Sequence, residues 1–191
     1  RRRIPLTGVG PRNLTLIGTT AYVAEYFTDT IGVLDIDPAV RPNAKSLKLG
    51  PDVEMTSARR GEMYFHDASL CFQKWQSCAT CHPADARPDA LNWDLLNDGM
   101  GNPKNTKSLL LSHETPPAMV TGVRASAEVG VRAGIRFIQF AVRPEKDAAD
   151  IDEYLKSLKP VPSPRLVRKN GKLTLSESAE RGRKVFEKAN C

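Results

Sequence analysis

One stretch of the chain carries residues whose types and spacing point to a covalent cofactor site: Cys78-Ala79-Thr80-Cys81-His82. Two thiols three positions apart can add to the two vinyl groups of one haem, and the adjacent imidazole can bind the iron as an axial ligand. The motif therefore predicts one haem c, attached through Cys78 and Cys81 and ligated by His82.

Two other chemistries use a Cys-x-x-Cys pair. A structural zinc site would need further ligands, for which Cys71 and His66 lie upstream, but such sites usually combine two close ligand pairs and the sequence has no second close pair. A thioredoxin-like redox pair needs a βαβ context, which the neighbouring residues do not suggest. We therefore favour haem, with a zinc-stabilised structural domain as an alternative.

A short segment occurs twice, each time ahead of a cysteine. Ser57 to Phe65 and Ser178 to Phe186 share Ser, Ala, Arg, Gly and Phe in register, and they lead to Cys78 and Cys191. This repetition predicts the same helix twice. Cys191 is then the first cysteine of a second, truncated haem motif, and we expect the chain to be a piece of a longer protein.

The second axial ligand of the first haem is sought among three residues downstream of the motif. Met100 and His113 are the candidate metal ligands, because a thioether or an imidazole completes a six-coordinate haem, whereas a peroxidase needs an open or displaceable site. A histidine placed like His113 is more often a surface residue. Met119 is predicted to be a core residue beside the haem.

The regions around the motif predict a mixed fold: a short antiparallel β segment followed by a mostly α-helical cytochrome c domain. Residues 1–36 contain three runs rich in β-branched and aromatic residues, and residues 37–55 are expected to be a linker. Residues 56–159 are assigned to the first haem domain, with an amphipathic helix at 147–158. Residues 160–191 are expected to form a spacer, a hairpin through Asn170-Gly171 and, after an N-cap at Ser176, the first helix of a second haem domain.

Two family resemblances cover most of the chain. Tyr22 to Asp35 is similar to the YVTN-type β-propeller repeat, which implies that residues 1–36 end a propeller blade. Residues from about 55 to 191 resemble the dihaem cytochrome c peroxidase and MauG-like family. Ser77 to Pro83 matches the first haem site of that family, and Asn105 to Leu110 is similar to its Arg-Asn-Thr-Pro-Ser-Leu signature.

The second resemblance implies hydrogen peroxide reduction at the first haem, electron donation by the second haem, and a calcium ion between them. Thr121 to Arg124, followed by Glu128, looks like the family's Trp-Asp-Gly-Arg region. By position, Arg124 would line the distal pocket or bind a propionate, and Glu128 would be the acid–base carboxylate. The family's Trp between the haems is replaced by Val120 or Thr121, which departs from the family's path for rapid electron transfer from the second haem. The alternative function is a non-catalytic electron-transfer module of a propeller–cytochrome fusion.

Composition restricts the partners and the location. The chain has 28 basic and 22 acidic residues, a net charge of +6, but the charges are interspersed and no nucleic-acid motif accompanies them. No run approaches the roughly 18 apolar residues that cross a bilayer. We expect a redox partner protein or a small electron donor, hydrogen peroxide as the substrate of the peroxidase hypothesis, and a periplasmic or otherwise exported bacterial location.

Overall fold

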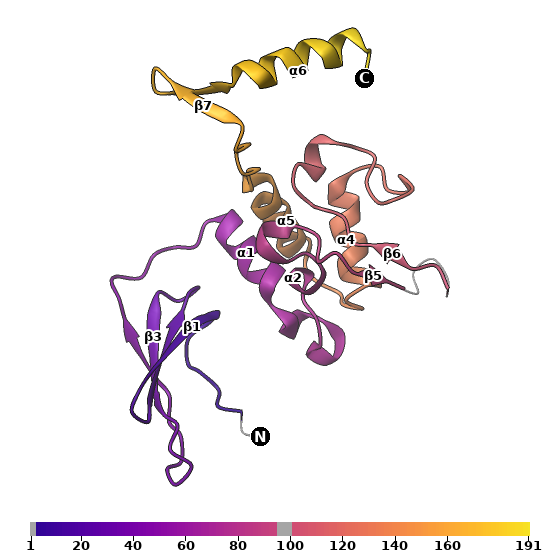
Figure 1. Cartoon of the computed structure of the whole chain (residues 1–191). Coiled ribbons are helices and arrows are strands. Elements are labelled where there is room, and N and C mark those ends of the chain that lie inside the picture. Colours follow the sequence, from indigo (N-terminus) through magenta and orange to yellow (C-terminus); the bar gives the residue numbers. More distant parts are fainter. Residues whose placement is uncertain (1–2, 95–100) are drawn as a thin grey trace. The chain divides into compact units, whose positions relative to one another are not determined.

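The computed structural model describes residues 3–94 and 101–191. The chain divides into two compact units, Arg1–Leu158 and Lys159–Cys191 (Figure 1). Divisions within the first unit near residues 36 and 55 stay a prediction. Among the described residues, we find no helix with the length and apolar character that crossing a membrane requires.

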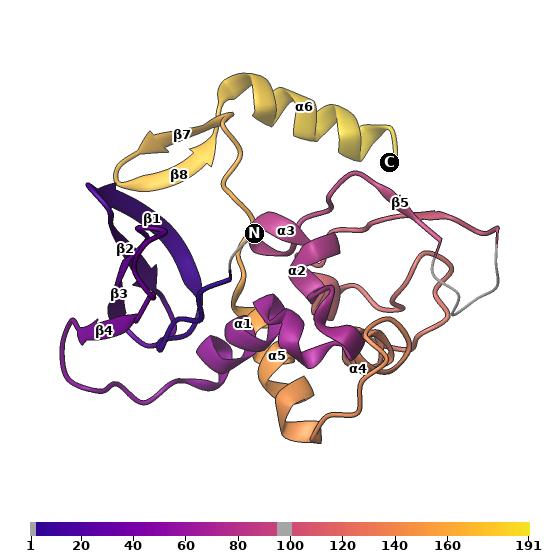
Figure 2. The same ribbon diagram turned by 90° about the horizontal axis from the view of Figure 1, so that it is seen from below.

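The first unit begins with a four-stranded antiparallel sheet. Strands β1 (Pro11–Ile17), β2 (Thr20–Glu25), β3 (Thr30–Asp35) and β4 (Lys45–Lys48) pair in chain order (Figure 2). Alternate residues of β2 and β3 face a small core that contains Ala21, Val23 and Leu34. The sequence predicted three of these strands, whereas β4 lies in the stretch 37–55 that was expected to be a linker.

Helices α1 (Ser57–His66) and α5 (Glu145–Ser157) lie side by side in both views of the chain. The two backbones come close at Gly61, where an added Cβ would lie 1.8 Å from the carbonyl oxygen of Asp150. Thr56 caps α1, its hydroxyl accepting a hydrogen bond from the Arg59 amide. A glycine is therefore required at position 61 for the two helices to make this contact.

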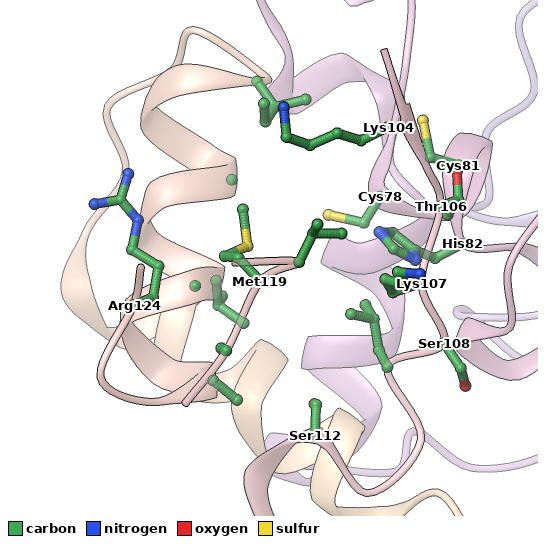
Figure 3. Close-up of a pocket in the computed structure, with 18 of the residues that line it drawn as sticks. Cys78, Cys81, His82, Lys104, Thr106, Lys107, Ser108, Ser112, Met119 and Arg124 are labelled. Carbon is green, nitrogen blue, oxygen red and sulfur yellow. The ribbon is translucent and has the colours of Figure 1, made fainter. Parts of the chain in front are cut away.

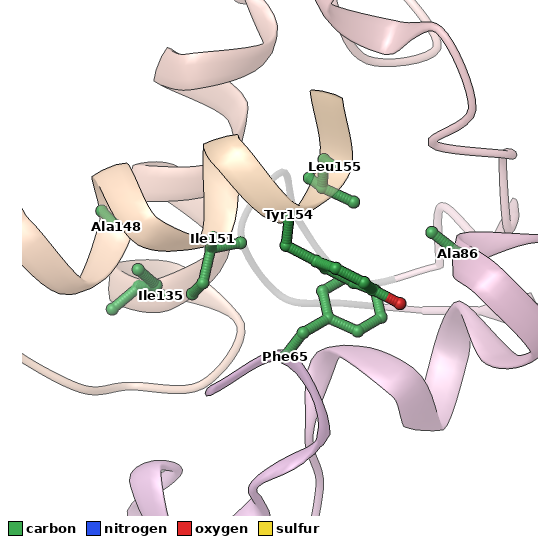
Figure 4. Close-up of a cluster of buried hydrophobic side chains, with 7 residues drawn as sticks. All are labelled: Phe65, Ala86, Ile135, Ala148, Ile151, Tyr154 and Leu155. Carbon is green, nitrogen blue, oxygen red and sulfur yellow. The ribbon is translucent and has the colours of Figure 1, made fainter. Parts of the chain in front are cut away.

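The main hydrophobic core forms between α1, α5 and α4 (Ala127–Phe137), with one residue from the short helix α3 (Pro83–Ala86; Figure 4). The Phe65 and Tyr154 rings are in tilted contact, with 5.2 Å between their centroids. The buried set is Phe65, Ala86, Ile135, Ala148, Ile151, Tyr154 and Leu155. The predicted apolar face of the helix near 147–158 is confirmed, since Ile151, Tyr154 and Leu155 are all buried.

A buried carboxylate joins α1 to α5. Asp150 is 2% exposed, and it accepts hydrogen bonds from Ser57, from Arg60 Nε at 2.9 Å and from Lys146 Nζ at 2.9 Å. Burial by itself would raise the pKa of Asp150, but these donors outweigh it and lower the pKa to about 2. The carboxylate is therefore ionised at neutral pH and paired with charges on both helices.

Regular structure is sparse among the residues that the structure describes between α1 and α4, namely 67–94 and 101–126. The elements there have two to four residues each: η1 (Ala68–Leu70), η2 (Phe72–Lys74), α2 (Cys78–Cys81), α3 (Pro83–Ala86), β5 (Asn92–Trp93), β6 (Lys104–Asn105) and η4 (Ser112–Glu114). The prediction of a mostly α-helical domain over residues 56–159 is therefore wrong. Pro83 begins α3, and four further prolines in this stretch disfavour helix because proline lacks the amide donor: Pro88, Pro103, Pro116 and Pro117.

The second unit is a hairpin followed by a helix. Strands β7 (Leu166–Lys169) and β8 (Lys172–Leu175) pair through Asn170 and Gly171, whose φ angles of 51° and 75° are those of a tight hairpin turn. The Ser176 hydroxyl accepts a hydrogen bond from the Ala179 amide and caps α6 (Glu177–Lys188). The predicted hairpin and N-cap are both confirmed.

Candidate cofactor site

The Cys-x-x-Cys-His motif forms one helical turn and its end. Cys78 and Cys81 are the first and last residues of α2, and His82 follows as the C-cap, its amide donating to the Cys78 carbonyl at 2.9 Å. Ser77 and Thr80 stabilise the start of this turn, since the Ser77 amide donates to the Thr80 hydroxyl at 3.0 Å. Residues three apart on a helix are neighbours on its surface, and both cysteines line the same cavity.

These three residues line a cavity of about 520 Å³. Its volume falls within the range of roughly 300–1,000 Å³ that is typical of cofactor and small-molecule sites. In Figure 3, Cys78 and His82 point into the cavity from one side, and Met119 faces them from the other. Apolar side chains dominate the walls, among them Phe65, Leu109, Val131, Ile135, Ile151 and Leu155.

The two thiols of the motif are free and protonated. Burial raises the pKa of Cys78 to about 12 and also raises the pKa of Cys81. A thioredoxin-like redox pair needs the opposite, a cysteine whose pKa is lowered so that the thiolate attacks. The surroundings of α2 therefore do not favour the redox alternative.

His82 has the properties of an available ligand. Its Nδ1 atom is buried without a hydrogen-bond partner. Burial lowers the pKa of His82 below its usual value. A hydrogen bond with the Lys107 backbone and the negative charge of Asp89 act in the opposite direction, but the effect of burial is larger. The imidazole is consequently neutral at physiological pH, which is the form that binds metal ions.

Met119 does not lie in the core as predicted. It lines the cavity, is 46% exposed and has a left-handed backbone with φ of 73°. Few residues other than glycine adopt that region of φ. The sequence prediction failed because an apolar side chain by itself does not show whether it faces packed neighbours or a cavity.

Of the two residues predicted to be catalytic, Arg124 and Glu128, only Arg124 is among the residues that line the cavity. Arg124 lines the cavity, and its buried Nε atom lacks a hydrogen-bond partner. Glu128, in the first turn of α4, is not among the cavity-lining residues and lies 3.6 Å from Lys156. The pKa of Glu128 is lowered mainly by a hydrogen bond from its own backbone amide and, to a smaller extent, by one from the Ser126 side chain. The carboxylate is therefore ionised at neutral pH.

Met100 and His113 are the two candidate metal ligands downstream of the motif. Met100 lies outside the described residues. The His113 side chain is buried, not on the surface, and its Nε2 atom lies 3.0 Å from Asp152 Oδ1, while Arg132 bonds the other oxygen of that carboxylate. His113 is not among the residues that line the cavity, although its neighbour Ser112 is.

The other cysteines lie apart from the motif. Cys71 is buried, and its thiol donates to the Phe72 carbonyl at 3.3 Å. Cys191 is exposed at the end of the second unit. Among the described residues, no group of three or more His, Cys, Asp or Glu side chains is arranged to hold a metal ion, so the zinc alternative lacks a ligand set there.

The sequence did not predict the pairing of Asp89 with Trp93 on the cavity wall. The Trp93 indole lines the cavity and donates to the Asp89 carboxylate at 2.8 Å, and the Leu91 amide donates to the same carboxylate at 2.9 Å. Asp89 thus holds the indole in place. The only local signal for this pairing is the spacing Asp-x-Leu-x-Trp. It does not predict the hydrogen bond between Asp89 and Trp93 unless the turn between these two residues is known.

Comparisons with known proteins find similarity to a protein outside the predicted family. No protein-family model matches the chain. It is 31% identical over 146 residues to hydrazine synthase subunit gamma of Kuenenia stuttgartiensis, which covers 70% of this chain and 40% of the relative. The chain thus spans less than half of the length of that protein.

A solved structure shows a similar fold. A chain of Kuenenia stuttgartiensis hydrazine synthase, pressurised with 20 bar xenon, superposes with a TM-score of 0.61 and 22% sequence identity. The match covers 78% of this chain and 57% of that chain. It supports a mixed arrangement of short sheets and helices rather than a mostly α-helical cytochrome c domain.

The predicted family and function are therefore corrected. Neither a dihaem cytochrome c peroxidase or MauG-like protein nor a YVTN-type propeller is found, so peroxide reduction and an electron-transfer module are not supported. The error has a physical reason. Cys78, Cys81 and His82 predict only how a cofactor would be attached, and a mode of attachment does not specify the reaction.

Proposed function

We propose that the chain is part of a subunit of a hydrazine-synthase-type enzyme and that its cavity holds one haem c. Cys78 and Cys81 would form the thioether bonds, and His82 would bind the iron. The observation that supports the cofactor is the placement of two free thiols and an unpartnered imidazole nitrogen on the wall of one apolar cavity. The enzyme class rests on the relationship to the gamma subunit, and it implies other subunits as protein partners.

The thiols are in the form that the attachment uses. Each S–H adds across one vinyl C=C, so that the sulfur bonds to one carbon and the hydrogen ends on the other, with no further reactant. Both thiols are protonated because burial raises their pKa values. The helical turn of α2 holds the two sulfur atoms in a fixed relation to each other and to His82.

The remaining residues of the cavity would shape and shield the site. Apolar walls exclude water, and Asp89 fixes the Trp93 indole on one of them. Lys107 and Arg124 also line the cavity, and their positive charge suits the two carboxylates of a haem. A carboxylate would give the unpartnered Nε of Arg124 an acceptor. When bound, the haem would supply a redox-active iron for the N–N bond formation that hydrazine synthesis requires.

An alkaline pyridine haemochrome spectrum of the full chain, expressed with a cytochrome c maturation system, tests the cofactor. We expect a c-type spectrum with about one haem per chain, because a single complete motif is present. The double variant Cys78→Ala, Cys81→Ala is expected to lose covalent haem, and the control Cys71→Ala is expected to keep it. A haem-free wild-type chain, or covalent haem in the double variant, would overturn the assignment.

The enzyme class needs a second measurement on the purified native assembly that contains this chain. Hydrazine formation is expected in that assembly and is expected to disappear with the double cysteine variant, while Cys71→Ala retains it. An assembly with fully loaded haem and no hydrazine formation would reject the enzyme class and leave the cofactor assignment intact.

A further inference from the structure

We propose that the Met119 thioether is the second axial ligand of the iron, opposite His82. This inference rests on the proposed haem site and adds a residue to it. His82 and Met119 come from separate parts of the first unit, the end of α2 and the loop ahead of α4, and Figure 3 shows them on facing sides of the same cavity. Thioether sulfur is an established axial ligand of covalently bound haem.

The backbone holds Met119 in place. Its neighbour Ala118 pairs with Arg124, the Ala118 amide donating to the Arg124 carbonyl at 2.8 Å and the Arg124 amide donating back at 3.3 Å. Inside this closed loop, the Gly122 amide donates to the Met119 carbonyl at 3.2 Å. A methionine at φ of 73° is strained, and strained residues concentrate at ligand-binding positions.

The exposure of Met119 also indicates a ligand. Met119 is 46% exposed, whereas Ile135 and Ile151, which line the same cavity, are 7% and 3% exposed. The thioether therefore lacks the packed neighbours that a core methionine has. A cofactor in the cavity would supply them.

The other donor groups near the cavity are less suitable. Lys107 lies beside His82 in Figure 3, on the wall opposite Met119, so it is not placed to bind the iron from the side that faces His82. The Nε2 atom of His113 is engaged by Asp152, and its Nδ1 atom lies 3.4 Å from the Ser112 hydroxyl. Among the cavity-lining side chains that the structure describes, Met119 is the thioether.

The proposed ligand would make the site selective for small molecules that can displace it. A thioether binds iron less firmly than an imidazole and gives a higher reduction potential than a second histidine would. A small ligand would then reach the iron only in the fraction of molecules in which Met119 has dissociated.

Spectroscopy of the haem-loaded full chain tests the ligand. Met119→Leu removes the sulfur and nearly conserves side-chain volume. Met63→Leu, on α1 and not among the cavity-lining residues, is the matched control. We expect wild type and Met63→Leu to show the ferric charge-transfer band of methionine ligation, and Met119→Leu to lose it.

Two further readouts separate ligation from a purely structural role. If Met119 occupies the iron in about 90% of molecules or more, its removal raises the apparent affinity of the ferrous haem for carbon monoxide by about tenfold or more. Met119→His is expected to restore a six-coordinate spectrum with a lower reduction potential than wild type.

The outcomes distinguish this inference from the proposed function. A methionine band that persists in haem-loaded Met119→Leu, or a wild-type haem without that band, would overturn the ligand and leave the haem assignment standing. A wild-type chain without covalent haem would overturn both.

Discussion

Replacement of Gly61 by alanine tests the packing on which the cavity depends. The new Cβ would lie 1.8 Å from the Asp150 carbonyl oxygen and 2.4 Å from its carbonyl carbon, whereas real contacts of this kind essentially never fall below 3.0 Å. Both opposing atoms belong to the backbone, so no side-chain rotation can relieve the overlap. Helices α1 and α5 must therefore separate by about 1 Å or more.

The expected loss of stability follows from two opposing effects. Alanine improves helix propensity over glycine by about 1 kcal/mol. The overlap, together with the gap that it opens around Phe65, Ile151 and Tyr154, costs about 3–5 kcal/mol. We therefore expect Gly61→Ala to lower the free energy of unfolding of the first unit by about 2–4 kcal/mol.

Urea unfolding of the full chain, followed by far-UV circular dichroism at equal haem loading, measures this change. Gly182→Ala is the matched control, because Gly182 holds the corresponding place in the repeated segment but an added Cβ there meets nothing within 4 Å. The control is expected to leave the unfolding of the first unit within about 0.5 kcal/mol of wild type. A Gly61→Ala chain as stable as that control would refute the close approach of α1 and α5.

Two further predictions concern buried carboxylates. Because the pKa of Asp150 is lowered to about 2 in the folded chain from the usual 3.8, its contribution of roughly 2 kcal/mol is fully present above pH 4 and is lost as the pH falls towards 2. Asp150→Asn should flatten that part of the stability curve in urea titrations between pH 2 and pH 5, and an unchanged slope would contradict the assignment. Asp152→Ala is expected to cost about 3–5 kcal/mol, since it leaves His113 and Arg132 without their carboxylate. Its control is Glu153→Ala, whose side chain is 52% exposed, and equal stabilities of the two variants would exclude a stabilising role for the buried pair.

Local signals predicted local structure well. The Asn170-Gly171 turn, the Ser176 cap and the apolar periodicity that places Ile151 and Leu155 on one face all appear as expected. Each of these depends on residues within a few positions of one another, so the sequence contains the complete information. The mostly α-helical prediction failed for the converse reason. In residues 67–94 and 101–126 the structure has only elements of two to four residues, and local sequence signals do not specify how such short elements are arranged.

The family prediction shows a second limit. Gly61 and Phe65 in the sequence correctly indicated a closely packed helix. The cysteine motif that follows indicated where a cofactor would attach. These features are requirements of a cofactor pocket, so proteins with different reactions can share them. The similarity to hydrazine synthase subunit gamma had to come from comparison over 146 residues.

The sequence by itself determined the spacing of Cys78, Cys81 and His82, because three donors within one helical turn need no distant residue to be brought together. Only the tertiary structure decided what faces them. The loop that carries Met119 is separated from the motif by more than thirty residues, and the pairing of Ala118 with Arg124 turns the thioether into the cavity. His113 is instead engaged by Asp152 of α5. Contacts of this range depend on how helices and loops pack, which the order of residue types along the chain does not specify.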